Sequence, residues 1–173
     1  MKTRLKIFLF CTASLVFIGC DRATKNLAKE QLQGKESITY FHDTFRLQYA
    51  ENTGAALGFG DGLSRQMSFW LLSILPVCFL IGLFFYAVKH ARGMGFMKMF
   101  SLALIFSGGI GNIIDRLLFD RHVTDFMNFG IQNFRTGIFN VADVCVTAGA
   151  TGLLLFFRDK ELSTGLQTNS MPV

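Results

Sequence analysis

Two aspartates lie inside apolar stretches of this chain: Asp125 within Val-Thr-Asp-Phe-Met and Asp143 within Asn-Val-Ala-Asp-Val. A carboxylate at hydrocarbon depth is costly unless it faces a wet or polar cavity, so an acid in a membrane segment is a functional candidate. Two carboxyl groups that lie close together in a poorly solvated site share one proton. The ionised member can take a proton from water while the protonated member donates to a peptide carbonyl oxygen. The pair therefore predicts peptide-bond hydrolysis without a covalent intermediate.

Polar side chains accompany the aspartates at helical spacing. Asn112 and Arg116 are four residues apart, and Asn140 and Asp143 are three apart. Residues at these separations share one face of a helix. We expect both faces near the outer ends of two membrane helices, where Asn112, Arg116 and Asn140 would orient the acids. Asp125 falls in the preceding loop, 18 positions before Asp143, which is enough for a turn that brings the two carboxyl groups together.

A purely structural role is the alternative for these residues. Asp143 and Arg116 could form a buried ion pair that only stabilises packing. Two acids and two asparagines at one interface favour catalysis instead, because satisfying so many buried polar groups for packing alone is costly. Nearby, Asp115 has the position of a surface charge at a helix end, and Asn52 that of a turn residue, unless the motifs that contain them carry a family resemblance.

The composition predicts a membrane protein that carries these residues on helices. The chain has 173 residues, of which 51% are hydrophobic, and a mean hydropathy of +0.40. A bilayer core of roughly 30 Å requires about 20 apolar residues in a helix. Four apolar segments meet or approach that length, at 7–24, 67–88, 99–116 and 138–157. We therefore expect an all-α membrane protein with four transmembrane helices, formed by a single domain over residues 1–173.

Basic residues predict the orientation of the four helices. Lysines and arginines precede the first span, fill the link at 89–98 and follow the last span. Such residues concentrate in short cytoplasmic loops. Both termini are therefore expected in the cytoplasm, and the longer connections at 22–66 and 115–137 are expected on the outer, periplasmic side. The two acids would then lie near the outer face.

The segment 37–62 predicts a small β-sheet. Its large apolar residues come close to strand alternation, at Ile38, Tyr40, Phe45, Leu47 and Tyr49. A break occurs around His42 and Asp43, and glycine-rich turns follow the alternation. We expect this segment to form a β-sheet cradle on the outer membrane surface. Residues 163–173 are polar and predict a flexible tail.

The same composition disfavours other classes of protein. The net charge of +5 is dispersed along apolar segments, so nucleic-acid binding is not expected. The four cysteines include no Cys-x-x-Cys pair and the three histidines no i,i+4 pair. We therefore expect no disulfide framework, no metal site and no cofactor.

Two rival functions arise from the sequence. The basic N-terminus, followed by an apolar run and Cys20, has the form of a lipoprotein signal peptide. Three further spans oppose that interpretation, and Asp21 and Lys25 continue a helical face beyond the cysteine. A proton-coupled membrane transport protein would also carry intramembrane acids. Four helices are few for a transporter, and both acids are expected at one interface rather than across the bilayer.

Five short motifs add a resemblance to this reading of the residues. They are Asp21-x-x-Thr24-Lys25, Glu51-Asn52-x-Gly54-Ala55-Ala56, Asn112-x-x-Asp115-Arg116, Val123-x-Asp125-Phe126 and Phe139-Asn140-x-Ala142-Asp143. Over roughly residues 5–157 the chain resembles the bacterial lipoprotein signal peptidases, also called signal peptidase II. Five motifs in order are far more specific than one short match. The chain departs from the family at Arg22, where Gln is frequent, and at Leu57, where Phe is common, and both departures concern substrate fit.

The resemblance implies an aspartyl endopeptidase of the bacterial inner membrane. Such an enzyme removes the signal peptide of prolipoproteins by cutting immediately before a diacylglyceryl-modified cysteine. By resemblance, Asp125 and Asp143 are the catalytic dyad. The residues that would support the dyad or substrate are Asn52, Asn112, Arg116 and Asn140, and those that would bind substrate are Asp21, Lys25, Gly54 and Ala55. The expected partners are lipid-modified prolipoproteins and membrane lipid, and we expect a monomer.

Overall fold

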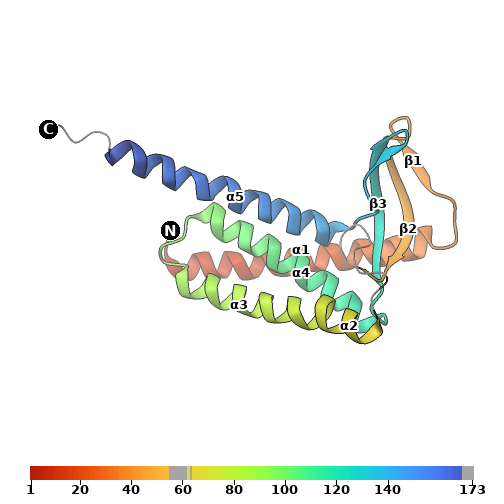
Figure 1. Ribbon diagram of the computed structural model, residues 1–173, viewed down its shortest axis with the longest axis horizontal. Helices are drawn as coiled ribbons and strands as arrows, with labels where there is room; N and C mark the ends of the chain where they lie inside the picture. Colours follow the sequence, from red (N-terminus) through yellow and green to blue (C-terminus); the bar gives the residue numbers. More distant parts are fainter. Residues whose placement is uncertain (55–61, 63, 169–173) are drawn as a thin grey trace.

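The first helix is longer than the membrane requires. The computed structural model describes residues 1–54, 62 and 64–168, with side chains described as far as residue 156. Helix α1 runs over Thr3–Leu32. Its 30 residues span about 45 Å at 1.5 Å per residue, which exceeds a bilayer core of roughly 30 Å. The helix therefore continues past the predicted span at 7–24 and carries its last turns to the sheet (Figure 1).

The second span is one continuous helix with a wider turn inside it. It comprises α2 (Arg65–Phe69), the π-helical turn η2 (Trp70–Ile74) and α3 (Leu75–His90). Pro76 follows the wide turn directly. A proline lacks the backbone N–H and its ring crowds the carbonyl four residues earlier, and a π turn at that point relieves both problems. The span covers the predicted segment 67–88 without a break.

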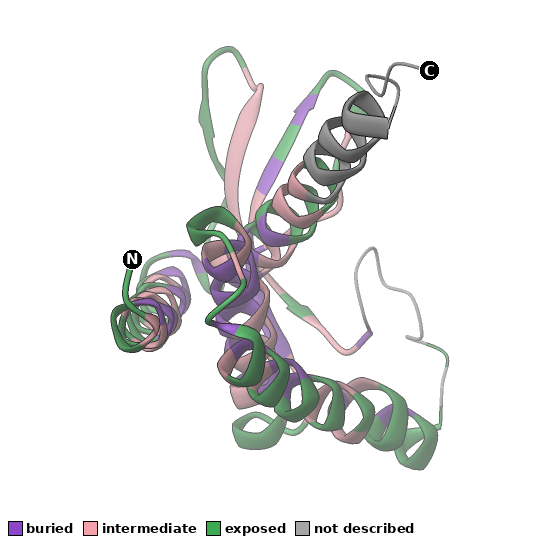
Figure 2. Cartoon of the chain, turned by 90° about the vertical axis from the view of Figure 1, so that its left-hand side faces the viewer, coloured by how far each residue is buried: buried purple, intermediate pink, exposed green. Residues whose placement is uncertain are grey.

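Helix α4 (Phe96–Leu118) is the centre of the bundle and packs against the other three spans. In α4, 50% of the most apolar window is buried, against 17% in α1 and 22% in the second span. The outer helices thus keep large apolar side chains exposed, as lipid-facing helices do (Figure 2). Close packing of α4 on the last helix needs glycine, because a Cβ on Gly108 would collide with the Ala142 carbonyl and one on Gly149 with the Ser101 carbonyl.

The last helix, α5, runs over Val141–Thr168. Within the described part of the chain, three helices are long and apolar enough to cross a membrane, and Val141–Phe156 is a shorter apolar helix. These four spans, together with the sheet described next, confirm the predicted fold class. The helix also continues through residues 163–168, where the sequence predicted a flexible tail, because no proline interrupts the segment before Pro172.

A four-stranded antiparallel sheet caps one end of the bundle. Its strands are β1 (Ile38–Tyr40), β2 (Phe45–Asn52), β3 (Val123–Ile131) and β4 (Phe134–Arg135), in the order β1-β2-β3-β4. The segment 37–62 therefore supplies only β1 and β2 among the described residues. The prediction that Asp125 lies in a loop is wrong, since it lies on β3 opposite Ala50.

The two ends of the bundle differ in what they carry. The sheet stands at one end, where the last turns of α1 pass its base (Figure 1). The N-terminus, the link between α3 and α4, and the C-terminal end of α5 lie toward the other end. The predicted orientation requires successive spans to run in opposite directions, and this arrangement agrees with that requirement.

Candidate active site

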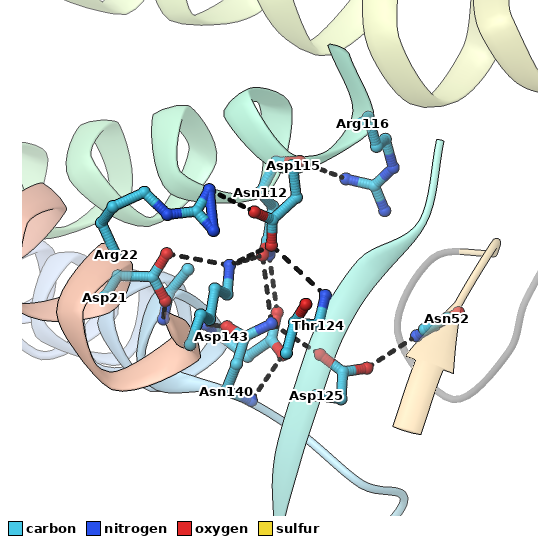
Figure 3. A network of polar contacts seen from close by, with 12 residues as sticks. Asp21, Arg22, Asn52, Asn112, Asp115, Arg116, Thr124, Asp125, Asn140 and Asp143 are labelled. Atoms are coloured by element: carbon cyan, nitrogen blue, oxygen red, sulfur yellow. Dashed lines mark hydrogen bonds and ion pairs between the residues drawn. The ribbon is translucent and has the colours of Figure 1, made fainter. Parts of the chain in front are cut away.

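The two aspartates come from different layers and reach one cavity. Asp125 projects from β3, whereas Asp143 lies in the first turn of α5. Both line a cavity of about 710 Å³ where the sheet meets the helix ends (Figure 3). The same cavity is lined by three of the predicted supporting residues, Asn52, Asn112 and Arg116. Apolar residues of the second span and of α5, among them Leu72, Pro76, Val144 and Val146, complete its wall.

Asn140 links the two acids. Its Nδ2 donates to Asp125 Oδ1 at 2.6 Å and to Asn112 Oδ1 at 3.1 Å. Its backbone N–H donates to Asp143 Oδ2 at 3.1 Å, and the Asp143 N–H donates back to Asn140 Oδ1 at 3.0 Å. This reciprocal pair of bonds has the geometry of a capping box. The start of α5 is therefore fixed by the same two residues that bring Asp143 beside Asp125.

Two more asparagines satisfy the remaining carboxyl oxygens. Asn112 Nδ2 donates to Asp143 Oδ1 at 2.8 Å, and Asn52 Nδ2 donates to Asp125 Oδ2 at 3.0 Å. Each of the four oxygens thus accepts a bond from an amide N–H. Among the ion pairs of the described residues, none involves either acid. Amides rather than cations hold the two carboxyl groups, so protonation of either group does not break a salt bridge.

The surroundings of Asp125 favour its protonated form. Only 2% of the residue is exposed, and this burial is the main reason that its pKa rises to about 6. The nearby charge of Asp143 raises the pKa further, while the bonds from Asn52 and Asn140 oppose the rise. Asp125 can therefore carry a proton close to neutral pH, as a general acid must.

Arg116 anchors the end of β2 rather than pairing with an acid. Its Nη2 donates to the Gly54 carbonyl at 2.8 Å, and its Nη1 donates to the Asn112 carbonyl at 3.4 Å. The alternative of an Asp143–Arg116 ion pair is therefore not realised in the described part of the chain. The Gly54 N–H donates to Asn52 Oδ1, so Asn52 is a turn residue and an acid-binding residue together. Ala55 lies outside the described residues, and so does Leu57.

A buried ion cluster lies behind the cavity. Lys25 Nζ contacts Asp21 Oδ2 at 2.8 Å and Asp115 Oδ2 at 2.9 Å, and it donates to Asn112 Oδ1 at 3.0 Å. The exposed fractions of these three charged residues are 1% for Lys25, 2% for Asp21 and 0% for Asp115. Asp21 and Lys25 thus lie one layer behind the cavity wall, not on it. The prediction of a surface charge at Asp115 is wrong, because that face of α4 turns toward α1, where Arg22 also pairs with it.

The cluster is also bonded to the backbone beside each acid. Asp21 Oδ1 accepts from the Ala142 N–H at 2.9 Å, immediately before Asp143. Asp115 Oδ2 accepts from the Thr124 N–H at 3.3 Å, immediately before Asp125. One lysine therefore joins two carboxylates, each of which fixes the chain next to one acid of the cavity. The helical spacing of Asp21 and Lys25, and that of Asn112 and Asp115, indicated that each pair shares a helix face. These spacings did not predict that α1 and α4 meet at the cluster.

The chemistry open to this arrangement is acid–base chemistry. A water molecule in the cavity would have a carboxyl group from each of two elements within reach. No group of three His, Cys, Asp or Glu side chains suited to a metal ion occurs among the residues that the structure describes. The carboxyl pair is a group in this cavity that can both give and take a proton.

Comparisons with known proteins point to one family. The family model for Signal peptidase (SPase) II matches residues 13–158. A lipoprotein signal peptidase of Chlorobaculum parvum is 40% identical over 161 residues, covering 87% of this chain and 95% of that protein. One from Halothermothrix orenii is 35% identical over 147 residues, covering 85% and 93%. A solved structure described as a bacterial membrane enzyme has a TM-score of 0.74 at 25% identity, covering 95% of this chain and 93% of that one.

Proposed function

This chain belongs to the signal peptidase II family, a family of membrane-embedded proteases, and from that premise we propose how it acts and on what. It removes signal peptides from prolipoproteins by cutting immediately before a diacylglyceryl-modified cysteine. Water is activated by Asp125 and Asp143. The observation that carries this proposal is the convergence of both carboxyl groups on one cavity, bridged by Asn140.

The two acids take different roles in the proposed reaction. Asp143 lies in the first turn of α5, where the helix dipole favours a negative charge, and it takes a proton from the attacking water. Asp125, with its pKa raised to about 6, donates a proton to the oxygen of the scissile carbonyl. The tetrahedral intermediate then collapses as Asp143 passes its proton to the leaving nitrogen and Asp125 takes back a proton from a hydroxyl of the intermediate, which returns both acids to their starting states. No covalent intermediate with the enzyme is formed.

The polar residues around the dyad have positioning roles in this proposal. Asn52, Asn112 and Asn140 orient the carboxyl oxygens through the bonds described above. Arg116 keeps the Gly54 carbonyl, and with it the end of β2, at the edge of the cavity where a substrate backbone would enter. Asp21 and Lys25 act from behind the wall, and Ala55 is proposed to contact substrate by family resemblance alone.

The cavity also suits a membrane-embedded substrate. Its apolar wall lies on helices that cross the bilayer, and its polar end lies beneath the sheet. A signal-peptide helix with a lipidated cysteine combines an apolar body with a polar scissile bond. We place the site near the outer face of the inner membrane, with both termini cytoplasmic, and we propose that the enzyme works as a monomer.

The direct test uses a synthetic precursor peptide with a diacylglyceryl-modified cysteine and the purified protein in detergent. Mass spectrometry should find a single cut on the N-terminal side of that cysteine. The same peptide without the lipid should be cut at least about tenfold more slowly, since a missing apolar group of this size removes more than 1.4 kcal/mol of binding. A cut elsewhere, or equal rates for both peptides, would refute the proposed specificity.

The same experiment separates the rival functions. A transport protein would leave the precursor peptide intact. A processed lipoprotein would carry a modified Cys20 at its own N-terminus, which the intact mass of the purified protein reveals. Helix α1 is continuous across Cys20, and Asp21, Lys25 and Ala28 beyond it are buried in the fold. These contacts support retention of α1 in the active protein.

A further inference from the structure

A second cavity lies at the opposite end of the bundle from the acids. Its volume is about 770 Å³, and it lies between the end of α3, the link to α4 and the helices α4 and α5. Its rim carries Lys89, Arg92 and Lys98, and its floor is formed by the apolar side chains of Leu102, Leu153 and Phe156. A cavity with a basic rim and an apolar floor matches an amphiphilic ligand.

Lys89 and Arg92 lie in a stretch of the chain without acids. Between residues 62 and 114 the sequence contains no Asp or Glu. Among the ion pairs of the described residues, none involves Lys89 or Arg92. Helix α4 begins at this cavity with Gly95 as N-cap, without a side-chain cap and without an acid in its first turn. Both the side chains and the helix N-terminus therefore favour a negative group here.

The rim is also pre-organised from outside the cavity. The buried Lys6 of α1 reaches across to the link and donates to the carbonyls of Ala91 at 3.2 Å, Arg92 at 3.4 Å and Met94 at 2.5 Å. Ala91 is itself fully buried. The backbone that carries Arg92 is thus fixed before any ligand binds, which lowers the entropic cost of binding.

We propose that this cavity binds one anionic phospholipid. The phosphate lies beside Lys89 and Arg92, and an acyl chain lies along Leu102, Leu153 and Phe156. A basic pocket between transmembrane helices is the type of site that selects anionic headgroups. A soluble phosphate compound would use the rim and leave the apolar floor exposed to water, so the lipid is the occupant that satisfies both parts of the cavity. This inference is independent of the chemistry proposed for the acids.

The test is native mass spectrometry of the purified full chain in neutral detergent. Phosphatidylglycerol and phosphatidylcholine with the same acyl chains are titrated separately. One phosphatidylglycerol should bind at least about fivefold more tightly than phosphatidylcholine, and the variant Lys89→Gln/Arg92→Gln should weaken it by at least about tenfold. Equal affinity for the two lipids would overturn the proposal. Competition by inorganic phosphate at millimolar concentration would do the same, because it would identify a soluble anion as the ligand.

Two controls separate this cavity from general attraction of a basic surface. Lys2→Gln/Arg4→Gln removes the same charge at the same end of the bundle, but neither residue lines the cavity, so binding should be unchanged. A Cβ on Gly93 would meet no atom within 4 Å, so Gly93→Glu and Gly93→Gln are sterically matched. Only Gly93→Glu should lower phosphatidylglycerol binding. Equal losses in Lys2→Gln/Arg4→Gln and Lys89→Gln/Arg92→Gln, or in the two Gly93 variants, would contradict a site here.

Discussion

Two pairs of aspartates lie close together in this fold, and they differ in their partners. Asp21 and Asp115 share one ammonium group, that of Lys25, in a cluster that is almost completely buried. Among the described residues, Asp125 and Asp143 accept hydrogen bonds from amides, and they face a cavity. The residue type is the same and the distance between the pairs is one layer of side chains. The partners therefore decide whether a carboxyl group stabilises the fold or is free to exchange a proton.

The difference has a physical basis. A buried carboxylate paired with a cation depends on that cation, because removing it leaves an uncompensated buried charge. Amide donors carry no net charge, and at Asp125 they do not offset the burial that raises its pKa. An active site built on acid–base chemistry needs the second arrangement. The first one belongs behind it, where it can hold the backbone in place.

The largest expected effect is on catalysis by the amide-bound pair. Asp125→Asn and Asp143→Asn should each lower the turnover of a lipid-modified precursor peptide by about 10²- to 10⁴-fold, because each removes one proton-transfer group. Circular dichroism should report the same helix content as the wild type. Near-normal turnover in either variant would refute the roles assigned to the dyad.

A large effect on stability is expected from the cation-bound pair. Lys25→Met leaves two buried carboxylates without their shared cation, and breaking a buried ion pair costs about 3–5 kcal/mol. Thermal unfolding in detergent measures this loss. Lys29→Met makes the same chemical change one turn later on α1, where the exposed Lys29 only contacts the Phe119 ring, so its midpoint should change little. Similar midpoints for the two variants would show that the cluster does not stabilise the fold.

A smaller effect is expected in the pH dependence. Asp125 is protonated below its pKa of about 6, so if it is the general acid, turnover falls as the pH rises through that value. The bond from Asn52 favours the charged form and lowers this pKa. Asn52→Ala should therefore shift the falling limb of the pH–rate profile to higher pH, whereas Asn26→Ala on the exposed face of α1 should not. A shift to lower pH would contradict the assignment of Asp125 as the acid.

The smallest effect is expected at the edge of the ion cluster. Arg22 Nη1 pairs with Asp115 Oδ1 at 2.5 Å, but its side chain is 26% exposed. Asp115 keeps Lys25 and the Thr124 N–H when Arg22 is removed. Arg22→Gln should therefore cost no more than about 1 kcal/mol, as partly exposed pairs do. Thermal unfolding of Arg22→Gln and Lys25→Met under the same conditions tests this ranking. A larger loss of stability in Arg22→Gln than in Lys25→Met would contradict it.

The helices could be predicted from the sequence because hydropathy records what faces lipid. The spans at 67–88 and 99–116 agree with the second span and α4 to within a few residues. The ends of α1 and α5 were less predictable, since a polar helix beyond the membrane leaves no hydropathy signal. Strand β3 was missed because its partner β2 lies more than seventy positions earlier, and alternation within Val123–Ile131 is interrupted at Asp125 and Phe126.

The site was predictable where its members share a helix or a motif. Asn140 and Asp143 lie together as their helical spacing predicted, and Asn112 contacts both from α4. Asp115 could not be assigned in the same way, since an acid at a helix end looks solvent-exposed until a neighbouring helix covers it. Its burial depends on the approach of α1 to α4, and that packing is a property of the assembled bundle.

The strand that carries Asp125 has one further consequence. One acid lies on the sheet and the other on the helical bundle, so the distance between them depends on how the sheet packs against the helix ends. A molecule that binds between the sheet and the helix ends would inhibit the enzyme by moving the two carboxyl groups apart, without contacting either acid. Such an inhibitor would bind at the contact between sheet and helices, so it would not have to resemble the substrate.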